Sequence, residues 1–255
     1  SDGYLMFFNI QTKAKLFEYQ VCELPIEKVN FSVFEPELLI VSTGSGFIAI
    51  INIQEGKTIW NPPKEFKSHF GFFSPHNKDQ FFITTTNSFF MVYNERTQRP
   101  AVTFAETNNS TIVSLAFSNF DKDIVAATYL DGSVTIFNLA TNNVIKISDA
   151  SSLAMKSVFH PTIEGIIASA GKKGIITLYD YKAGKTLCEF RAHTSSIVSF
   201  DVSPAYPTLL ITSASDSSIK FWSIDRLFVK QFLTNIIDMK LDWARQLEGS
   251  VQLFK

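Results

Sequence analysis

This sequence of 255 residues has few cysteines and a net charge close to zero. The two cysteines, Cys22 and Cys188, lie far apart and lack metal-ligand spacing, so we expect free thiols rather than a disulfide or a nucleophile. This usage indicates a reducing intracellular compartment, nuclear or cytoplasmic. Lysine and arginine number 23 against 24 acidic residues, without a dense basic cluster. Nucleic acid is therefore an unlikely direct ligand.

Long apolar runs and cofactor-binding motifs are missing as well. No 18-residue apolar stretch is present, so we expect no membrane span. The opening residues SDGYLMFF lack the basic and apolar regions of a signal peptide, and we do not expect secretion. Phosphate-binding loops, dinucleotide-binding loops and nucleophile elbows are absent too. The sequence predicts no cofactor, no metal and no small-molecule substrate.

The four histidines do not indicate catalysis. None of His69, His76, His160 and His193 has a partner at metal-ligand spacing. We expect His76 and His160, which lie beside proline-containing turns, to be exposed. Asp216 and its neighbouring serines, with His193 nearby, could be taken for a hydrolase triad, but the equivalent positions recur as turns along the chain. We therefore predict no catalytic residues and no enzymatic activity.

An apolar and aromatic composition dominates what is present. Hydrophobic residues make up 45% of the chain, charged residues 18%, and phenylalanine alone accounts for 25 residues. This composition is globular, and a chain of this size can bury about 70–75% of its unfolded surface. Many phenylalanines with few charges favour strands that pack on both faces.

An eight-residue block recurs along the whole chain. Its last residue falls at positions 9, 52, 94, 138, 180, 223 and 255, so the intervals are 43, 42, 44, 42, 43 and 32. Each block has Gly or Ser second, then an apolar run, a bulky residue and a polar end. The blocks are DGYLMFFN, SGFIAIIN, NSFFMVYN, DGSVTIFN, KGIITLYD, DSSIKFWS and EGSVQLFK.

The segments between the blocks also repeat, as three further short apolar strands in each period. Four antiparallel strands every 40–45 residues are typical of a β-propeller blade. One such sheet cannot bury both of its faces, but stacked sheets cover one another. We therefore predict an all-β fold, a seven-bladed β-propeller of four-stranded antiparallel blades, forming a single domain over residues 1–255.

Both ends of the repeat are irregular. The first block lacks its two preceding strands, and the last interval is 32 residues. We interpret the first and last blades as incomplete members of a seven-bladed ring. The alternative is a ring of six blades and part of another.

At the best-preserved repeat, His193–Ser223, the sequence resembles the WD-repeat propeller family. Ala192-His193 stands where the family has Gly-His, and IKFWS where it has Trp-Asp. The resemblance implies a hydrogen-bonded set within the blade, made of His193, Thr212, Asp216 and Trp222. The other repeats are degenerate, which indicates a divergent member of the family.

The resemblance also implies function through surface contacts, because propellers bind partners mainly through their loops. Exposed aromatic and arginine side chains are the usual anchors. We therefore single out a partner-binding loop set: Trp60, Pro62, Pro63, Arg191 and Tyr206. For Trp60, a strand position packed between blades is the alternative.

The predicted function is a non-enzymatic protein-interaction scaffold, a subunit of a multi-protein assembly whose partners are other proteins. Two alternatives remain open at this point. One is an RNA-associated subunit of a ribonucleoprotein complex, and the other is a cytoskeletal, centriolar or trafficking adaptor.

Overall fold

The structure is a computed structural model that describes residues 3–62, 68–85, 90–94, 99–104, 110–148, 154–203, 206 and 209–223. All regular elements in these residues are β-strands, which confirms the all-β fold. The chain forms two compact units, Ser1–Val113 and Ser114–Lys255. The single domain over residues 1–255 stays a prediction.

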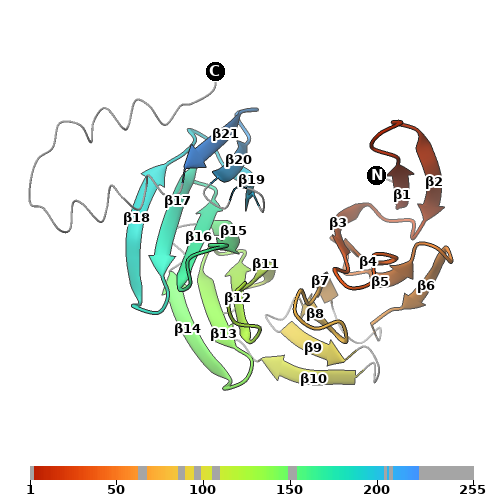
Figure 1. Ribbon diagram of the computed structural model, residues 1–255, viewed down its shortest axis with the longest axis horizontal. Helices are drawn as coiled ribbons and strands as arrows, with labels where there is room; N and C mark the ends of the chain where they lie inside the picture. Colours follow the sequence, from red (N-terminus) through yellow and green to blue (C-terminus); the bar gives the residue numbers. More distant parts are fainter. Residues whose placement is uncertain are drawn as a thin grey trace, which may run out of the picture. The chain divides into compact units, whose positions relative to one another are not determined.

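The first unit contains three antiparallel sheets (Figure 1). A two-stranded sheet pairs β1 (Tyr4–Phe8) with β2 (Lys15–Gln20). The second sheet consists of β3 (Ile26–Phe31), β4 (Leu38–Thr43), β5 (Ile48–Asn52) and β6 (Lys57–Trp60). The third consists of β7 (Ser68–Phe73), β8 (Gln80–Thr85), β9 (Phe90–Asn94) and β10 (Arg99–Phe104).

The second unit repeats this plan. Its first sheet consists of β11 (Ile112–Phe117), β12 (Ile124–Tyr129), β13 (Val134–Asn138) and β14 (Asn143–Ser148). The next consists of β15 (Ala154–Phe159), β16 (Ile166–Gly171), β17 (Ile175–Asp180) and β18 (Lys185–Arg191). A three-stranded sheet follows, with β19 (Ile197–Val202), β20 (Leu209–Ala214) and β21 (Ile219–Ser223).

Consecutive strands are neighbours in every sheet, so the predicted four-stranded antiparallel blade is confirmed in both units. The predicted block at residues 2–9 becomes β1, which pairs with β2 among the described strands. The last predicted block, Glu248–Lys255, lies outside the described residues. The number of blades in the whole chain stays a prediction.

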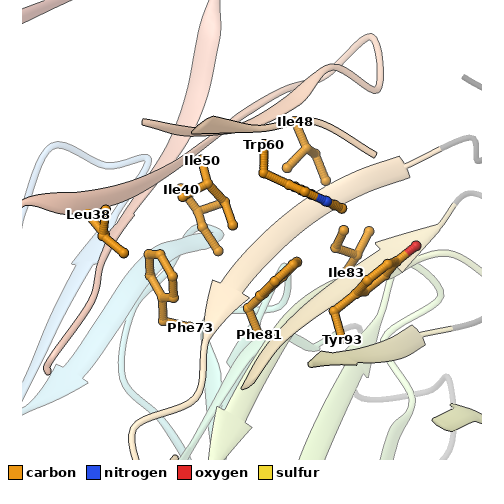
Figure 2. Packing of buried hydrophobic residues seen from close by; sticks show 9 residues of the cluster. All are labelled: Leu38, Ile40, Ile48, Ile50, Trp60, Phe73, Phe81, Ile83 and Tyr93. Carbon is orange, nitrogen blue, oxygen red and sulfur yellow. The ribbon is translucent and has the colours of Figure 1, made fainter. Parts of the chain in front are cut away.

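The core of the first unit lies between its stacked sheets. Successive side chains of a strand point to opposite faces, and both faces of β4 and β5 are buried. One face contributes to a cluster with the third sheet (Figure 2), made of Leu38, Ile40, Ile48, Ile50, Trp60, Phe73, Phe81, Ile83 and Tyr93. The other face packs beside Leu5 of β1, through Leu39, Val41, Ala49 and Ile51. Two buried faces explain why these strands are almost continuously apolar.

The second unit buries the sheet of β15–β18 in the same way. Ala168, Ile176 and Leu178 pack on one face with Phe200 and Leu210 of the following sheet. The opposite face contributes a different cluster, made of Ala116, Ala126, Ile136, Phe159, Ile167, Tyr179 and Tyr181. Each sheet thus supplies the apolar surface that its neighbour needs, which is the physical basis of a stacked repeat.

Short polar side chains also join neighbouring sheets within each unit. Asn30 of β3 accepts a hydrogen bond from the backbone N–H of Phe73, at 2.8 Å. In the second unit, the hydroxyls of Thr128 and Ser157 lie 2.8 Å apart. Such bonds satisfy buried polar groups and fix how adjacent sheets stack. Among the described residues, no helix is long and apolar enough to cross a membrane.

Candidate functional site

A polar set is formed by residues of the sheet β19–β21 and of the segments beside it. His193 precedes β19, Thr212 belongs to β20, Asp216 lies in the β20–β21 turn, and Trp222 belongs to β21. The antiparallel register places Lys220 opposite Thr212 and Trp222 two residues further on the same face. As a result, the indole Nε1 of Trp222 donates to the hydroxyl of Thr212 at 2.9 Å.

His193 connects this hydroxyl to the turn. Its Nε2 lies 2.8 Å from Thr212 Oγ1, and its Nδ1 lies 3.0 Å from Ser218 Oγ and 3.4 Å from Asp216 Oδ2. The four residues that the resemblance groups together are thus close in space, joined by Ser218.

The direction of each hydrogen bond follows from the donors available. An indole N–H can only donate, so Thr212 Oγ1 accepts from Trp222 and its own proton is directed to His193 Nε2. The neutral imidazole then carries its proton on Nδ1 and donates to Ser218 Oγ, an assignment made from the network. The hydroxyl of Ser218 donates in turn to Asp216 Oδ1 at 2.5 Å. Each proton in the chain of bonds has an acceptor.

The electrostatics agree with a neutral imidazole. Burial lowers the pKa of His193, the nearby Lys220 lowers it further, and Asp216 acts in the opposite direction. The pKa of Asp216 is lowered to about 2, mainly because the side chain and backbone of Ser218 donate to its carboxylate. At neutral pH the set therefore combines a carboxylate with an uncharged, buried imidazole.

Sequence reasoning missed the contribution of Ser218, although a local signal existed. Its backbone N–H donates to Asp216 Oδ1 at 3.0 Å. The same arrangement occurs in another blade, where the backbone and hydroxyl of Ser133 donate to Asp131 Oδ1 at 2.9 and 2.7 Å. Asp-x-Ser at a hairpin turn is a known self-capping pattern, and here it recurs at the turn that precedes the third strand.

This arrangement differs from that of an activated serine nucleophile. The side chain of His193 is 1% exposed, and both of its ring nitrogens are occupied. The proton of the Ser218 hydroxyl is directed to Asp216 rather than to the imidazole, which is the reverse of an activated nucleophile. Within the described residues, no group of three His, Cys, Asp or Glu side chains is arranged to hold a metal ion.

The set also anchors the sheet to its neighbour. The backbone N–H groups of Ala192 and His193 both donate to the carbonyl of Gly174, at 2.8 and 3.0 Å. Lys220 Nζ donates to the carbonyl of Ala192 at 2.8 Å. The segment that enters β19 is therefore held between the β16–β17 turn and β21.

The structure corrects the loop placement of Trp60. Its backbone pairs with Ile50 at the end of β6, and its side chain is 9% exposed. The ring packs edge-on against Phe81 and Tyr93, with centroids 4.9 and 5.3 Å apart. The indole therefore lies in the core between two sheets (Figure 2). This is the strand position between blades that was the alternative interpretation for Trp60. Pro62 is half-buried, and Pro63 lies outside the described residues.

The other two predicted anchors are exposed but lie apart. Arg191 ends β18 opposite Ile175, beside the β16–β17 turn. Tyr206 is 68% exposed in the β19–β20 connection, where its N–H donates to Ser203 Oγ. That connection is at the opposite end of β19 from the segment that follows Arg191. The two side chains therefore do not form one loop cluster.

The predicted exposure of His160 is wrong. The residue is 4% exposed, because its Nδ1 accepts the backbone N–H groups of Thr162 and Ile163 at 3.2 and 3.0 Å. The imidazole thus caps the turn after β15. His76 is half-buried. Cys22 and Cys188 are both free and half-buried.

A concentration of exposed apolar side chains between positions 4 and 34 was not predicted. Of 21 large hydrophobic side chains that are exposed among the described residues, 11 lie between positions 4 and 34. We call the following residues the N-terminal apolar surface: Tyr4, Met6, Phe8, Ile10, Leu16, Phe17, Leu24, Val29, Phe31, Val33 and Phe34. Concentrated exposed apolar side chains are characteristic of interaction sites.

Comparison with known proteins gives matches to WD-repeat proteins. Residues 184–223 match the profile of the WD domain, G-beta repeat. Angio-associated migratory cell protein of Homo sapiens is 26% identical over 121 residues, which are 48% of this chain and 27% of that protein. The p21-activated protein kinase-interacting protein 1-like of Xenopus laevis is 34% identical over 85 residues, 33% of this chain and 21% of that protein. The match thus spans about a quarter of these relatives.

Solved structures agree with the fold. The C-terminal WD40 domain of Sif2 superimposes with a TM-score of 0.74 at 16% identity, covering 89% of this chain and 62% of that one. A chain of the mitotic checkpoint complex also superimposes with a TM-score of 0.74 at 16% identity, and the match covers 87% of this chain and 68% of that one. The repeat that carries the polar set is the repeat that matches the family profile. The chain therefore contains one repeat that matches the WD-repeat profile, and it shares the fold of WD40 domains.

Proposed function

We propose that this protein is a non-enzymatic interaction scaffold, a subunit of an intracellular multi-protein assembly. WD-repeat propellers generally act as scaffolds that bind other proteins, and they are typically not enzymes. The polar set around His193 supports this proposal, because His193 and Thr212 are buried and the groups of the set are hydrogen-bonded to one another.

The N-terminal apolar surface is the observation that carries the proposal. Met6 and Phe8 are each 55% exposed, and Val33 is 68% exposed. Leaving these side chains in water is unfavourable by about 25 cal/mol per Å² of apolar area. A partner protein that covered them would recover this free energy.

Rigidity makes such a surface effective. The sheet β3–β6, which carries part of this surface, has both faces of its central strands buried, so little ordering of that sheet is needed when a partner binds. Low ordering cost leaves more of the contact energy available as affinity. The ribonucleoprotein and cytoskeletal or trafficking settings are alternatives that no contact in the described residues favours.

The test is native purification of the tagged chain from cells that express it, followed by mass spectrometry. We expect partner proteins at fixed stoichiometry that are lost in the Met6→Asp, Phe8→Asp double variant and retained with Ile145→Asp, at a side chain that is 45% exposed. Loss of the partners after ribonuclease treatment would instead favour the RNA-associated alternative. A chain that purifies alone at low salt would refute the scaffold proposal.

A further inference from the structure

The turns after the strands β3, β7, β11, β15 and β19 share one construction. In each turn, a side chain just after the strand accepts one or two backbone N–H groups from residues two or three positions further on. The residues that provide these caps are Ser32, Ser74, Ser118, His160 and Ser203. Such side-chain caps fix the conformation of a turn, so the side chains at its corner have defined positions.

Exposed apolar side chains occupy these corners in the second unit. Phe120 lies two residues after the capping Ser118 and is 46% exposed. Ile163 lies three residues after the capping His160 and is 39% exposed. Tyr206 is exposed in the equivalent turn of the next sheet. The sheets that carry Phe120 and Ile163 have all four of their strands, so the exposure of these two side chains does not result from a missing strand.

The three turns lie at the same end of stacked sheets. At one end of the second unit, the backbone N–H of His193 donates to the carbonyl of Gly174 in the β16–β17 turn. The β19–β20 turn lies at the opposite end, with the β15–β16 and β17–β18 turns. There, the backbone N–H of Tyr181 donates to the carbonyl of Gly165, and its hydroxyl is hydrogen-bonded to the side chain of Ser118. The apolar corners therefore follow one another across adjacent sheets.

Carboxylates stand beside the apolar corners. Asp121 directly follows Phe120, and Glu164 directly follows Ile163. The turns at residues 118–123, 160–165 and 181–184 contain three carboxylates and two lysines. One of these lysines, Lys182, already pairs with Glu164, with 2.6 Å between Nζ and Oε1. An acidic group next to an apolar side chain complements a ligand whose apolar residues are flanked by lysine or arginine.

The spacing of the sheets selects the shape of such a ligand. Stacked sheets lie about 10 Å apart, so equivalent corners recur at about this interval. An α-helix rises about 10.5 Å in seven residues, which make almost two full turns and return to the same face. Side chains on one face of a β-strand recur about every 6.6 Å instead. A helix with apolar residues seven positions apart therefore matches the corners.

We propose that Phe120, Ile163 and Tyr206, together with Asp121 and Glu164, form a docking surface for a basic amphipathic α-helix of a partner protein. We call these five residues the turn surface. The inference rests on the proposed scaffold function, and it adds a surface that is separate in sequence from the N-terminal apolar surface. The capped turns are fixed before binding, which keeps the ordering cost of docking low.

A synthetic peptide of about 18 residues can serve as the probe, because as a helix it spans two intervals of about 10 Å. It would carry leucines seven positions apart, lysines beside them and alanine elsewhere to favour the helix. We expect saturable binding to the full chain by fluorescence anisotropy. A control peptide of the same composition, with its leucines spread around the helix, should bind about tenfold more weakly or not at all, because its apolar side chains cannot meet the corners together.

Alanine variants test the apolar part of the turn surface. The Phe120→Ala, Ile163→Ala double variant should weaken binding of the peptide about tenfold or more, because two apolar anchors are lost. The matched control is Val144→Ala, Ile145→Ala on β14, at side chains that are 41% and 45% exposed, and it should bind as the parent does. Both variants should melt close to the parent protein, since the substituted side chains are exposed.

Amide variants test the charged part. The Asp121→Asn, Glu164→Gln double variant keeps an acceptor for the backbone N–H of Asp123, which Asp121 Oδ1 binds at 2.9 Å. It should bind the peptide more weakly than the parent does, and its affinity should depend less on salt concentration. Glu189→Gln, at an exposed position of β18, should leave both the affinity and its salt dependence unchanged.

Four results would overturn the proposal. The first is equal or absent binding of both peptides, which would leave the scaffold function intact if partner proteins still co-purify with the chain. The second is full binding by the Phe120→Ala, Ile163→Ala variant. The third is tighter binding of a proline-rich peptide with the same charges, which would make the ligand an extended segment. The fourth is a homodimer that the same alanine variant dissociates, which would make a second copy the occupant.

Discussion

The imidazole Nε2 of His193 lies 2.8 Å from the hydroxyl of Thr212, and the same hydroxyl accepts the indole N–H of Trp222 at 2.9 Å. Thr212 is 0% exposed, so water cannot replace it as a partner. One buried hydroxyl therefore joins the segment before β19 to the third strand of the sheet.

Replacing Thr212 with valine should destabilise the protein by about 2–4 kcal/mol. The shape is nearly conserved, but His193 Nε2 and the indole N–H both lose their partner, and unsatisfied buried polar groups are costly. Urea denaturation measures the change. Thr212→Ser keeps the hydroxyl and should recover most of the loss, whereas equal losses for both variants would contradict the hydrogen-bonded role.

Stability should fall in two steps as the pH decreases. The pKa of His193 is lowered from 6.5 in the folded protein, so below about pH 6.5 the unfolded chain binds protons more readily and the free energy of unfolding decreases. The pKa of Asp216 is lowered from 3.8 to about 2, so its contribution is present above 3.8 and is lost as the pH falls to about 2. Denaturation curves at pH 8, 6, 5 and 3 measure both steps.

The control for this pH dependence is His193→Gln, which cannot be protonated. Its stability should be lower at pH 8 and should decrease less between pH 8 and 5 than that of the parent protein, with the remaining decrease due to His69, whose pKa burial also lowers. If the variant kept the full decrease over that range, another group would be responsible.

Gly174→Ala should be far more harmful than Gly184→Ala. Both glycines have a positive φ, +72° and +65°, which costs an alanine about 1 kcal/mol or more. At Gly174 a Cβ would also lie 2.2 Å from the carbonyl oxygen of His193, whereas at Gly184 nothing lies within 4 Å. Thermal melting should show a loss of about 3 kcal/mol or more for the first variant and about 1 for the second. Similar losses would argue against the close approach.

Ser217→Gly should stabilise the protein by up to about 1 kcal/mol. Ser217 has a φ of 63°, a left-handed conformation that is unfavourable for residues with a Cβ. The corresponding turns use glycine, as at Gly46 and Gly132. Chemical denaturation measures the gain, and Ser223→Gly, within β21, should instead be neutral or destabilising. A loss at Ser217 would mean that its side chain contributes a contact.

Trp60→Ala should cost about 3–5 kcal/mol, as expected for a truncated core aromatic. The indole contacts Phe81 and Tyr93 between two sheets. Tyr206→Ala, at a side chain that is 68% exposed, should change stability by less than about 0.5 kcal/mol. Calorimetry compares the two variants. A small loss of stability in Trp60→Ala would contradict the buried position of this side chain.

Local patterns in the sequence were sufficient to predict the repeating unit. The period near 43 residues, the alternation within each strand and the short residue at each turn predict the antiparallel blade. These features follow from the conformational preferences of a few adjacent residues, which are the same in every copy. The polar set around His193 was grouped by the resemblance of this one repeat to the WD-repeat family rather than by local preferences.

Burial was decided by the tertiary structure. Trp60 precedes Asn-Pro-Pro and reads as a loop residue, but pairing with Ile50 places it in the core. His160 precedes a proline and reads as exposed, but it is buried while capping its turn.

The clearest contrast lies between Phe31 and Phe159. Both occupy the same position of the first strand, and the local sequence gives no reason to separate them. Phe159 is 7% exposed and Phe31 is 53% exposed, because one faces a four-stranded sheet and the other a sheet of two strands. The sequence by itself determined the strands and their turns. The tertiary structure decided which apolar faces are covered, because coverage depends on the neighbouring sheet rather than on the residues of the strand itself.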